Sequence, residues 1–242
     1  QGVIDASINC VNILSAVAPY ALEKRFVRAQ GQTATVRIRN VNTGTIVHAS
    51  MAVKDGEPVY AGEQQIQGVP GGGAPIELNF MQAIGSKTGK LFPTGCRRDE
   101  LGGLAFTFVD GSVPLLIVRA ADLGKTGYET PEALNADAAL LARIRQLRME
   151  VAERCGLGDV SHKVYPKLAM VSAPREDGEI SSRYFVPYAC HAAYAVTGGL
   201  TLGVAARIEG TIAHESARHG YRADAGEGFR IEHPSGHNRC CW

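Results

Sequence analysis

The chain has 242 residues, of which 45% are hydrophobic and 20% are charged, a composition typical of a globular protein with a packed core. Its 25 Lys and Arg residues nearly balance 24 Asp and Glu residues, so the formal net charge is only +1. This balance excludes the basic field with which proteins attract nucleic acid or anionic membranes. We therefore expect neither as a partner, and an anionic ligand must be bound by local groups.

The cysteines show neither a CxxC pair nor the compact spacing of a disulfide framework. Reduced thiols in a cytoplasmic protein are the simplest interpretation. No apolar run approaches the length of a membrane span. The first residues, Gln1-Gly2-Val3-Ile4-Asp5, have no initiator Met and no basic segment, so they are expected to lie within a longer protein rather than in a signal peptide.

The first third of the chain predicts one helix and several strands. Residues 10–24 form a helix candidate, which Pro19 should kink or end early. Its predicted apolar face consists of Ile13, Leu14, Val17 and Ala21. Period-two alternation predicts strands at residues 35–39 and 45–48, and a third strand is expected at residues 57–60. The turn formers of residues 68–75 give the best boundary between two lobes.

The remainder predicts a mixed α+β arrangement. Strands are expected at residues 76–80, 105–109, 114–119, 167–171 and 229–232. Thr130 as N-cap and Pro131 at the first helical position begin the clearest helix, which Gly156 ends. Residues 191–208 predict a second helix, rich in small residues. This helix and that of residues 10–24 are apolar nearly all round, so both are expected to be buried.

Two segments, residues 4–18 and 180–198, share one plan. Each has an extended piece, then a cysteine, then a small-residue helix, so Cys10 and Cys190 are each expected at a helix start. The plan suggests a duplication, but two similar helix starts arising by chance explain it equally well.

Cys10 is the leading candidate for chemistry. A thiol at a helix N-terminus lies near the positive end of the helix dipole, which lowers its pKa and favours the thiolate. The free N–H groups there can also hold a carboxylate or an enolate oxygen. Asn9 and Asn12 add neutral donors on either side. The alternative interpretation is a buried structural cysteine.

The Gly-rich segment of residues 85–95 is the second candidate. It is not a nucleotide-binding loop, because only three residues separate its first two glycines and Leu91 replaces the required Ser or Thr. The turn of Ser86, Lys87 and Thr88 is still suited to an anion nest for a carboxylate. A plain surface turn is the competing interpretation.

Two further residues are candidates for binding a carboxylate. His191 follows Cys190 at the second predicted helix start, where it can donate a hydrogen bond or transfer a proton. Lys167 begins an apolar strand, and we interpret it as a cation placed in a cleft rather than one that extends to solvent. A zinc site is not expected, because His214 and His219 are five residues apart and would not share one helical face.

At these residues the chain resembles the methylaconitate isomerase family, which includes aconitate Δ-isomerases and 4-oxalomesaconate tautomerases. The first matching stretch is Ser-Ile-Asn-Cys-Val-Asn-Ile-Leu at residues 7–14. Further matching stretches lie at residues 39–44, 68–70, 85–95, 120–124, 126–129, 157–161, 166–167, 191–198 and 232–236. Their number and order make the resemblance specific.

The resemblance implies a fold similar to diaminopimelate epimerase. Two pseudo-symmetric lobes are then expected, each a curled, mostly antiparallel sheet around a central helix, with the substrate in the cleft between them. Residues 1–67 would be the remainder of an incomplete first lobe, residues 68–215 the second lobe, and residues 216–242 a C-terminal segment that returns toward the first lobe.

The resemblance also assigns site residues. Cys10 aligns with the family's active-site cysteine, with Asn9, Val11 and Asn12 as its substrate-binding neighbours, and His191 should face the cleft from the other lobe. Two departures matter. Val11 replaces the usual glycine, and the family's catalytic lysine lies upstream of residue 1.

The implied activity is isomerisation of a small unsaturated tricarboxylate such as oxalomesaconate, methylaconitate or aconitate. A double bond moves by a 1,3-proton transfer, without a metal or an organic cofactor. A racemase that uses the thiols of Cys10 and Cys190 is the second hypothesis, and an inactive binding or structural fragment is the third. The sequence allows a homodimer without requiring one.

Overall fold

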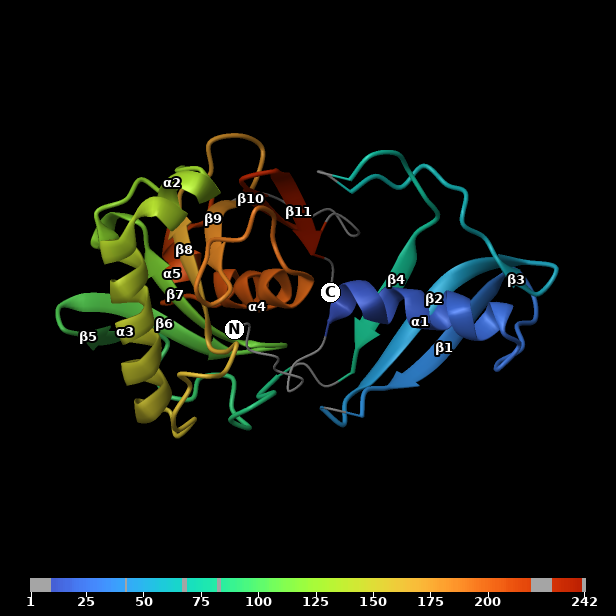
Figure 1. Ribbon diagram of the computed structural model, residues 1–242, viewed down its shortest axis with the longest axis horizontal. Coiled ribbons are helices and arrows are strands. Elements are labelled where there is room, and N and C mark those ends of the chain that lie inside the picture. The colour runs from blue at the N-terminus through green and yellow to red at the C-terminus, as the bar shows by residue number, and fades with distance from the viewer. Residues whose placement is uncertain (1–9, 42, 67–68, 82–83, 219–227, 241–242) are drawn as a thin grey trace. The chain divides into compact units, whose positions relative to one another are not determined.

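A computed structural model describes residues 10–41, 43–66, 69–81, 84–218 and 228–240. The chain divides into two compact units (Figure 1). The first comprises Ile4–Ala83 and the second comprises Gln1–Val3 with Ile84–Trp242.

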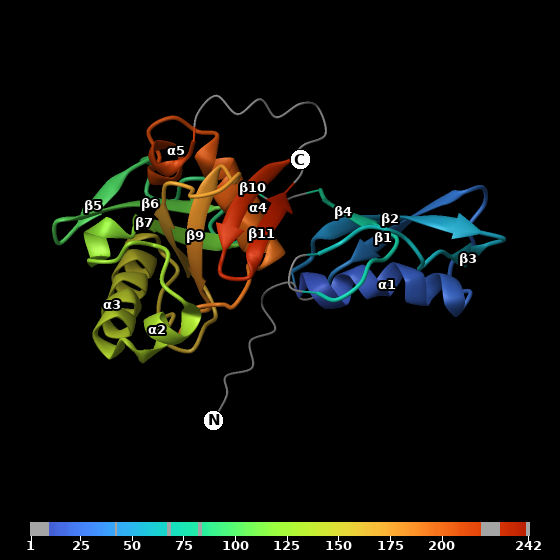
Figure 2. The same cartoon turned by 90° about the horizontal axis from the view of Figure 1, so that it is seen from above.

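The first unit is a small antiparallel sheet with one helix. Strand β2 (Ile46–Lys54) pairs with β1 (Thr33–Arg39) on one side and with β3 (Glu57–Pro58) and β4 (Ile76–Phe80) on the other. Alternate residues of β2, such as Val47 and Ala49, are fully buried because the period of a strand is two residues. Helix α1 (Val11–Glu23) lies against that face of the sheet (Figure 2).

One side of helix α1 is buried, and the opposite, solvent-exposed side also carries apolar residues. Leu14, Ala18 and Leu22 pack on the sheet. Ile13 and Val17 were predicted on the buried face, but 69% and 37% of their surfaces are exposed. The expectation that this helix is buried all round is therefore wrong for the first unit as described. Pro19 lies inside the helix without ending it.

The second unit contains a seven-stranded mixed sheet. Its strand order is β11-β10-β9-β8-β7-β6-β5. Antiparallel hairpins join β5 (Asp99–Leu101) to β6 (Leu104–Asp110), β6 to β7 (Pro114–Arg119), and β10 (Phe229–His233) to β11 (Gly236–Cys240). Strand β8 (Lys167–Ser172) is parallel to β7 and antiparallel to β9 (Ile180–Phe185). The strands predicted in this half are confirmed.

Helices cover both faces of this sheet (Figure 1). Ile144, Leu147 and Val151 of α3 (Ala138–Arg154) belong to one core, together with Leu116 and Met170. Helices α4 (Val196–Ala206) and α5 (Ile212–Ser216) contribute to the other core. The short elements η1 (Ala121–Leu123) and α2 (Pro131–Ala136) lead into α3. The two units together confirm the predicted α+β class.

The domain limits differ from those expected at residues 68 and 216. Strand β4 pairs with β2, so the division between the units follows residue 83 and not residue 67. At the other end, β10 pairs in parallel with β9, so residues 229–240 belong to the sheet of the second unit. Pairing between distant strands, which the turn-rich composition of residues 68–75 does not report, determines both limits.

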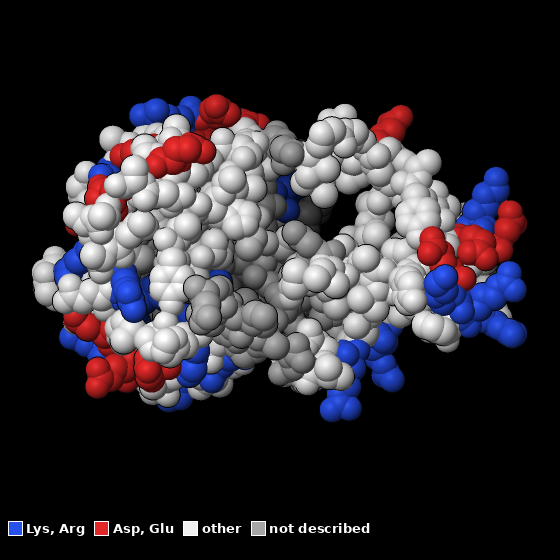
Figure 3. Space-filling view, in the orientation of Figure 1, with Lys and Arg blue, Asp and Glu red and all other residues white. Residues whose placement is uncertain are grey.

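The surface of the molecule has no charge field of one sign on the face drawn in Figure 3. Lys and Arg atoms alternate there with Asp and Glu atoms over the described residues, in keeping with the net charge of +1. No helix in the described part of the chain combines the length and the apolar character that crossing a membrane requires.

Candidate functional site

The N-termini of the described α-helices fall into two groups. Helices α2, α3 and α5 begin with a capping side chain, because Thr130, Asp137 and Thr211 each accept a hydrogen bond from a first-turn amide. Helices α1 and α4 begin at Cys10 and Ala195, and neither residue makes a side-chain cap. Neither helix has an acidic residue in its first turn. First-turn amides without an internal acceptor are suited to bind an anion.

Cys10 is exposed and is the N-cap residue of α1. Its carbonyl oxygen accepts a hydrogen bond from Leu14 N at 3.0 Å, which fixes the residue at the helix start. The predicted position at a helix N-terminus is therefore confirmed, and the alternative of a buried structural cysteine is wrong. Val11 is the first residue of the helix and is half-buried. Asn9 and the side chain of Asn12 lie outside the described residues.

Helix α4 begins five residues after the predicted start at His191. The bridge between Cys190 and Phe185 keeps residues 189–191 extended along the end of β9. The amide of Cys190 is bound by Asn135 Oδ1 at 2.7 Å, and the amide of His191 by Tyr184 O at 2.7 Å. These contacts hold the backbone away from helical geometry, so Cys190 is not at a helix start. The predicted repeat, with a cysteine at the start of each helix, is therefore wrong for the second segment.

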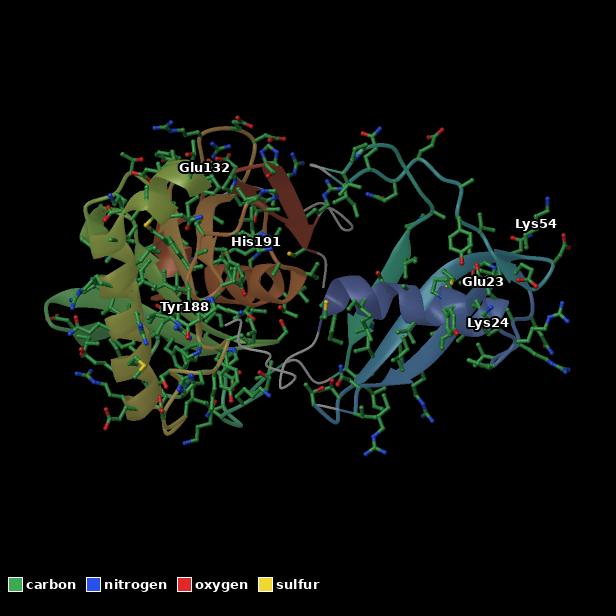
Figure 4. All side chains as sticks on the ribbon, in the orientation of Figure 1. Glu23, Lys24, Lys54, Glu132, Tyr188 and His191 are labelled. Carbon is green, nitrogen blue, oxygen red and sulfur yellow. The ribbon has the colours of Figure 1, made fainter. Side chains whose placement is uncertain are left out.

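His191 is half-buried on the segment that leads into α4 (Figure 4). Its Nδ1 accepts a hydrogen bond from Ala193 N at 3.0 Å. A neutral imidazole that accepts at Nδ1 carries its proton on Nε2. His191 is therefore oriented to donate from Nε2, the role expected of it toward a carboxylate.

Cys190 is buried, and burial raises the pKa of its thiol to about 11. Its Sγ lies 3.7 Å from the carbonyl oxygen of His191, an acceptor for the thiol proton. At neutral pH this residue is consequently a thiol, and it is a poor base.

Lys167 begins β8 and is only 6% exposed. By the two-residue period of a strand it shares a face with Ala169 and Val171, which pack in the core containing α4. The first turns of α4 lie over this region, because Gly198 packs on the ring of Tyr184, and Tyr184 pairs with Ala169. The Lys167 side chain therefore lies on the face of the sheet that α4 covers.

The turn of Ser86, Lys87 and Thr88 is an anion nest that Asp110 occupies. The amides of Lys87 and Thr88 donate to Asp110 Oδ2 at 2.8 and 2.6 Å. The hydroxyl groups of Thr88 and Ser86 donate to the same carboxylate at 2.8 and 2.7 Å. These four donors are therefore not available to a substrate carboxylate. The prediction that they bind a substrate carboxylate is wrong. The Lys87 ammonium lies 5.4 Å from the centre of the Tyr165 ring.

Two aromatic residues near α4 were not predicted. Tyr184 is fully buried against Gly198, and among the described residues its hydroxyl has no hydrogen-bond partner. His233 is also buried, and burial lowers its pKa to about 4, so it is neutral at pH 7. In the sequence, Tyr184 occupies an ordinary core position of a strand, and only the packing against Gly198 distinguishes it.

Glu176, Asp177 and His237 are a group whose ligand atoms lie within 4.8 Å of one another. Asp177 is already paired with Arg230, and His237 Nε2 lies 3.0 Å from Asp177 Oδ1. The two carboxylates are exposed. Ordinary ion pairs account for this group, so it gives no reason to infer a metal.

Comparisons with known proteins agree with this description. Residues 1–241 match the family model described as PrpF protein. The chain is 41% identical to the 4-oxalomesaconate tautomerase of Pseudomonas putida, over 96% of this chain and 64% of that protein. It is 34% identical to the 3-methylitaconate isomerase of Eubacterium barkeri, over 98% of this chain and 67% of that protein.

A crystal structure of methylitaconate-delta-isomerase is similar to the fold, with a TM-score of 0.83 and 33% identity over 95% of this chain and 64% of that one. The chain thus spans 64% to 67% of the length of these relatives. The matches confirm the resemblance detected in the sequence, and the chain belongs to the PrpF protein family.

Proposed function

We propose that this protein is a cofactor-independent isomerase that moves a C=C bond in a small unsaturated tricarboxylate by a 1,3-proton transfer. The observation that carries the proposal is the exposed thiol of Cys10 at the start of α1, a helix whose first turn has no side-chain cap from Cys10 and no acidic residue. The names of the relatives, 4-oxalomesaconate tautomerase and 3-methylitaconate isomerase, support the reaction class.

The proposed reaction begins when a base removes a proton from the carbon next to a double bond conjugated with a carboxylate or a ketone. The electron pair released from the C–H bond spreads over the conjugated system as a dienolate. Amide donors at a helix start stabilise the developing negative oxygen, and one such donor typically contributes about 10²–10³ in rate. Return of a proton two carbons away completes the shift, so atoms and charge balance without a redox step.

Cys10 is the proposed acid or base nearest to this chemistry. A positioned acid or base contributes about 10²–10⁴ in rate. Val11 and Asn12 are proposed to bind substrate through their backbone amides, which belong to the first turn of α1. Asn9 precedes this turn in sequence and is proposed to bind substrate by the resemblance to the family.

The second unit has its own groups suited to a carboxylate. The start of α4 has no side-chain cap from Ala195, and Lys167 lies on the face of the sheet beneath α4. His191 is oriented to donate from Nε2. We propose that these groups bind one carboxylate of the substrate. An uncapped helix start favours negative charge in its first turn, and a cation on the same face strengthens that preference.

The two-thiol racemase is a weaker hypothesis. It requires Cys190 to act as a base, but the pKa of this buried thiol is raised to about 11. The inactive fragment is a hypothesis that turnover by this 242-residue polypeptide itself would eliminate. Cys10, Cys96, Cys155 and Cys190 are free thiols, which supports a location in the reducing cytoplasm.

The test measures migration of the double bond by NMR. Oxalomesaconate, methylaconitate and aconitate are each incubated in D₂O with the full-length protein that contains this sequence. We expect migration of the double bond in one of them, with solvent deuterium incorporated at the carbon that receives the proton. Cys10→Ala should reduce turnover by about 10²–10⁴ if the thiol transfers the proton.

Cys96→Ala is the matched control, since Cys96 is also a free, exposed thiol but lies outside the proposed site. Its turnover should equal that of the unmodified protein. Little loss in Cys10→Ala would exclude Cys10 as an essential proton carrier, and no migration with any of the three acids would overturn the proposed function. A dimer is tested separately by light scattering.

A further inference from the structure

We propose that Tyr184 is a ligand-binding residue, whose hydroxyl group donates a hydrogen bond to a carboxylate oxygen held at the first turn of α4. This inference rests on the proposed function, because it specifies which side chain completes the carboxylate site of the second unit. Nothing in the sequence of β9 distinguishes this tyrosine from a core residue.

The first observation is the missing partner of the Tyr184 hydroxyl. Only 1% of the residue is exposed. Among the described residues, the hydroxyl group has no hydrogen-bond partner, neither a donor nor an acceptor. A buried hydroxyl without a partner destabilises a fold, so such groups are rare unless a ligand or an ordered water completes them. Burial also raises the pKa of Tyr184, so the group remains a protonated donor at neutral pH.

The neighbouring tyrosine shows that the core can satisfy such a group. The rings of Tyr184 and Tyr194 lie 4.7 Å apart, and both residues are buried. The hydroxyl of Tyr194 is bonded to Ser182 Oγ at 3.0 Å. The two tyrosines therefore share one environment, but only Tyr194 has an internal partner for its hydroxyl.

The second observation is the place where the unpaired hydroxyl lies. A Cβ built on Gly198 would stand 2.6 Å from Tyr184 Oη, so the hydroxyl lies beside the third residue of α4. Gly198 belongs to the first turn, whose amides have no side-chain cap from Ala195. Tyr184 Oη thus lies beside the first turn of α4. Both the hydroxyl and the first-turn amides are donors, and the N-cap side chain offers them no acceptor.

The first turn of α4 lies partly at the surface, since Val196, the first residue of the helix, is 36% exposed. A glycine at position 198 is required for the arrangement, because any side chain there would displace the Tyr184 ring. The site is suited to one carboxylate group, with the helix amides and Tyr184 Oη as neutral donors.

The experiment compares Tyr184→Phe with Tyr194→Phe in the full-length protein. Each substitution removes one oxygen atom from one of two adjacent buried rings. The probe is tricarballylate, a saturated tricarboxylate that cannot isomerise, and its Kd is measured by calorimetry. We expect the Kd to rise roughly ten- to hundred-fold in Tyr184→Phe, the loss expected for a hydrogen bond to a charged oxygen, and to change less than three-fold in Tyr194→Phe.

Thermal unfolding without ligand supplies a second readout. Removal of an unpaired buried hydroxyl should leave the Tm of Tyr184→Phe equal to or above that of the unmodified protein, whereas Tyr194→Phe should have a lower Tm. A resident water bonded to Tyr184 would instead lower the Tm of Tyr184→Phe and leave the Kd unchanged, which would overturn the inference. Failure of tricarballylate to bind the unmodified protein would overturn it too.

The two proposals fail separately. If the protein shows no isomerase turnover but Tyr184→Phe loses tricarballylate, the proposed function fails and the binding role of Tyr184 stands. If turnover is observed and Tyr184→Phe retains the KM and the Kd of the unmodified protein, the role of Tyr184 fails and the proposed function stands.

Discussion

Asp110→Ala should destabilise the second unit through the loop of residues 85–91. The carboxylate accepts hydrogen bonds from Lys87 N, Thr88 N and two hydroxyl groups. The backbone of Asp110 also bonds both ends of the loop, from Gly85 N at 2.7 Å and to Leu91 O at 2.8 Å. The substitution keeps the backbone bonds and removes only the carboxylate, so its effect measures the anion nest.

The magnitude follows from the donors left behind. A hydrogen bond to a charged group contributes about 1.5–3 kcal/mol, but water can reach donors that are only partly buried. We expect the free energy of unfolding to fall by about 2–4 kcal/mol, and the Tm by about 4–16 °C for a unit of this size. Asp110→Asn, which keeps one oxygen acceptor, should lose about half as much.

Urea unfolding followed by circular dichroism measures these differences. Asp122→Ala is the control, because Asp122 makes a surface ion pair with Arg119 at 3.5 Å, and such pairs contribute about 0–1 kcal/mol. The reasoning about the nest is refuted if the free energy of unfolding of Asp110→Ala lies within about 1 kcal/mol of that of the unmodified protein, because a surface ion pair contributes that much.

Two further outcomes concern buried basic groups of the second unit. The native state holds His233 neutral down to about pH 4, whereas the unfolded chain binds its proton below about pH 6.5. The unfolded state thus binds more protons in this window, so stability should fall by about 2–3 kcal/mol as the pH drops from 6.5 to 4. Urea titrations at both pH values should show a smaller fall in His233→Asn, and an equal fall would contradict the assignment. Arg148 is 1% exposed and donates to the carbonyl groups of residues 163, 165 and 166. Arg148→Met should therefore lower the free energy of unfolding, measured by thermal unfolding, by about 3–4 kcal/mol. The exposed Arg145→Met on the same helix is the control and should lower it by less than about 1 kcal/mol.

Local patterns in the sequence predicted the elements whose determinants lie within a few residues. The strands predicted at residues 105–109 and 114–119 form β6 and β7, which pair with each other. Thr130 caps α2 through Ala133 N at 3.2 Å, with Pro131 in the first turn. Each of these determinants acts over three or four residues, the distance over which a sequence pattern is informative.

Elements that depend on distant residues were placed wrongly. Residues 130–156 were predicted as one helix. The break at Asp137 was missed although its cap is local: Asp137 ends α2 and caps α3 through Leu140 N at 2.9 Å, three residues on. Lys125 fixes that carboxylate at 2.5 Å from twelve residues away. The start of α4 was likewise misplaced because Asn135 and Tyr184 bind the backbone of residues 190 and 191.

The candidate site was predicted in part, for the same physical reason. Cys10 was found because its helix follows it directly in sequence. The occupant of the Ser86 turn was missed, since Asp110 lies 24 residues away and reads in the sequence as a turn residue. Tyr184 was missed because an unpaired hydroxyl is a property of the three-dimensional environment and not of the residue type.

The uncapped start of α4 permits a test in which stability and binding move in opposite directions. Ala195→Asp places a carboxylate at the N-cap, where it can accept from the first-turn amides that we assign to the substrate. Such a cap should stabilise the protein by about 0.5–2 kcal/mol, because Asp replaces a residue that cannot cap. The same carboxylate would occupy the position of the ligand oxygen and repel its charge.

Ala195→Asp should therefore raise the Tm without ligand and abolish the binding of tricarballylate. Ala142→Asp is the control, since it adds the same charge at an exposed position of α3, which packs in the other core of the second unit. If Ala195→Asp raises the Tm and still binds the tricarboxylate as tightly as the control, the amides of α4 are not the binding groups. The missing N-cap and the buried, unpaired hydroxyl of Tyr184 would then lower the stability of the protein without serving a ligand. The carboxylate site would lie elsewhere in the chain.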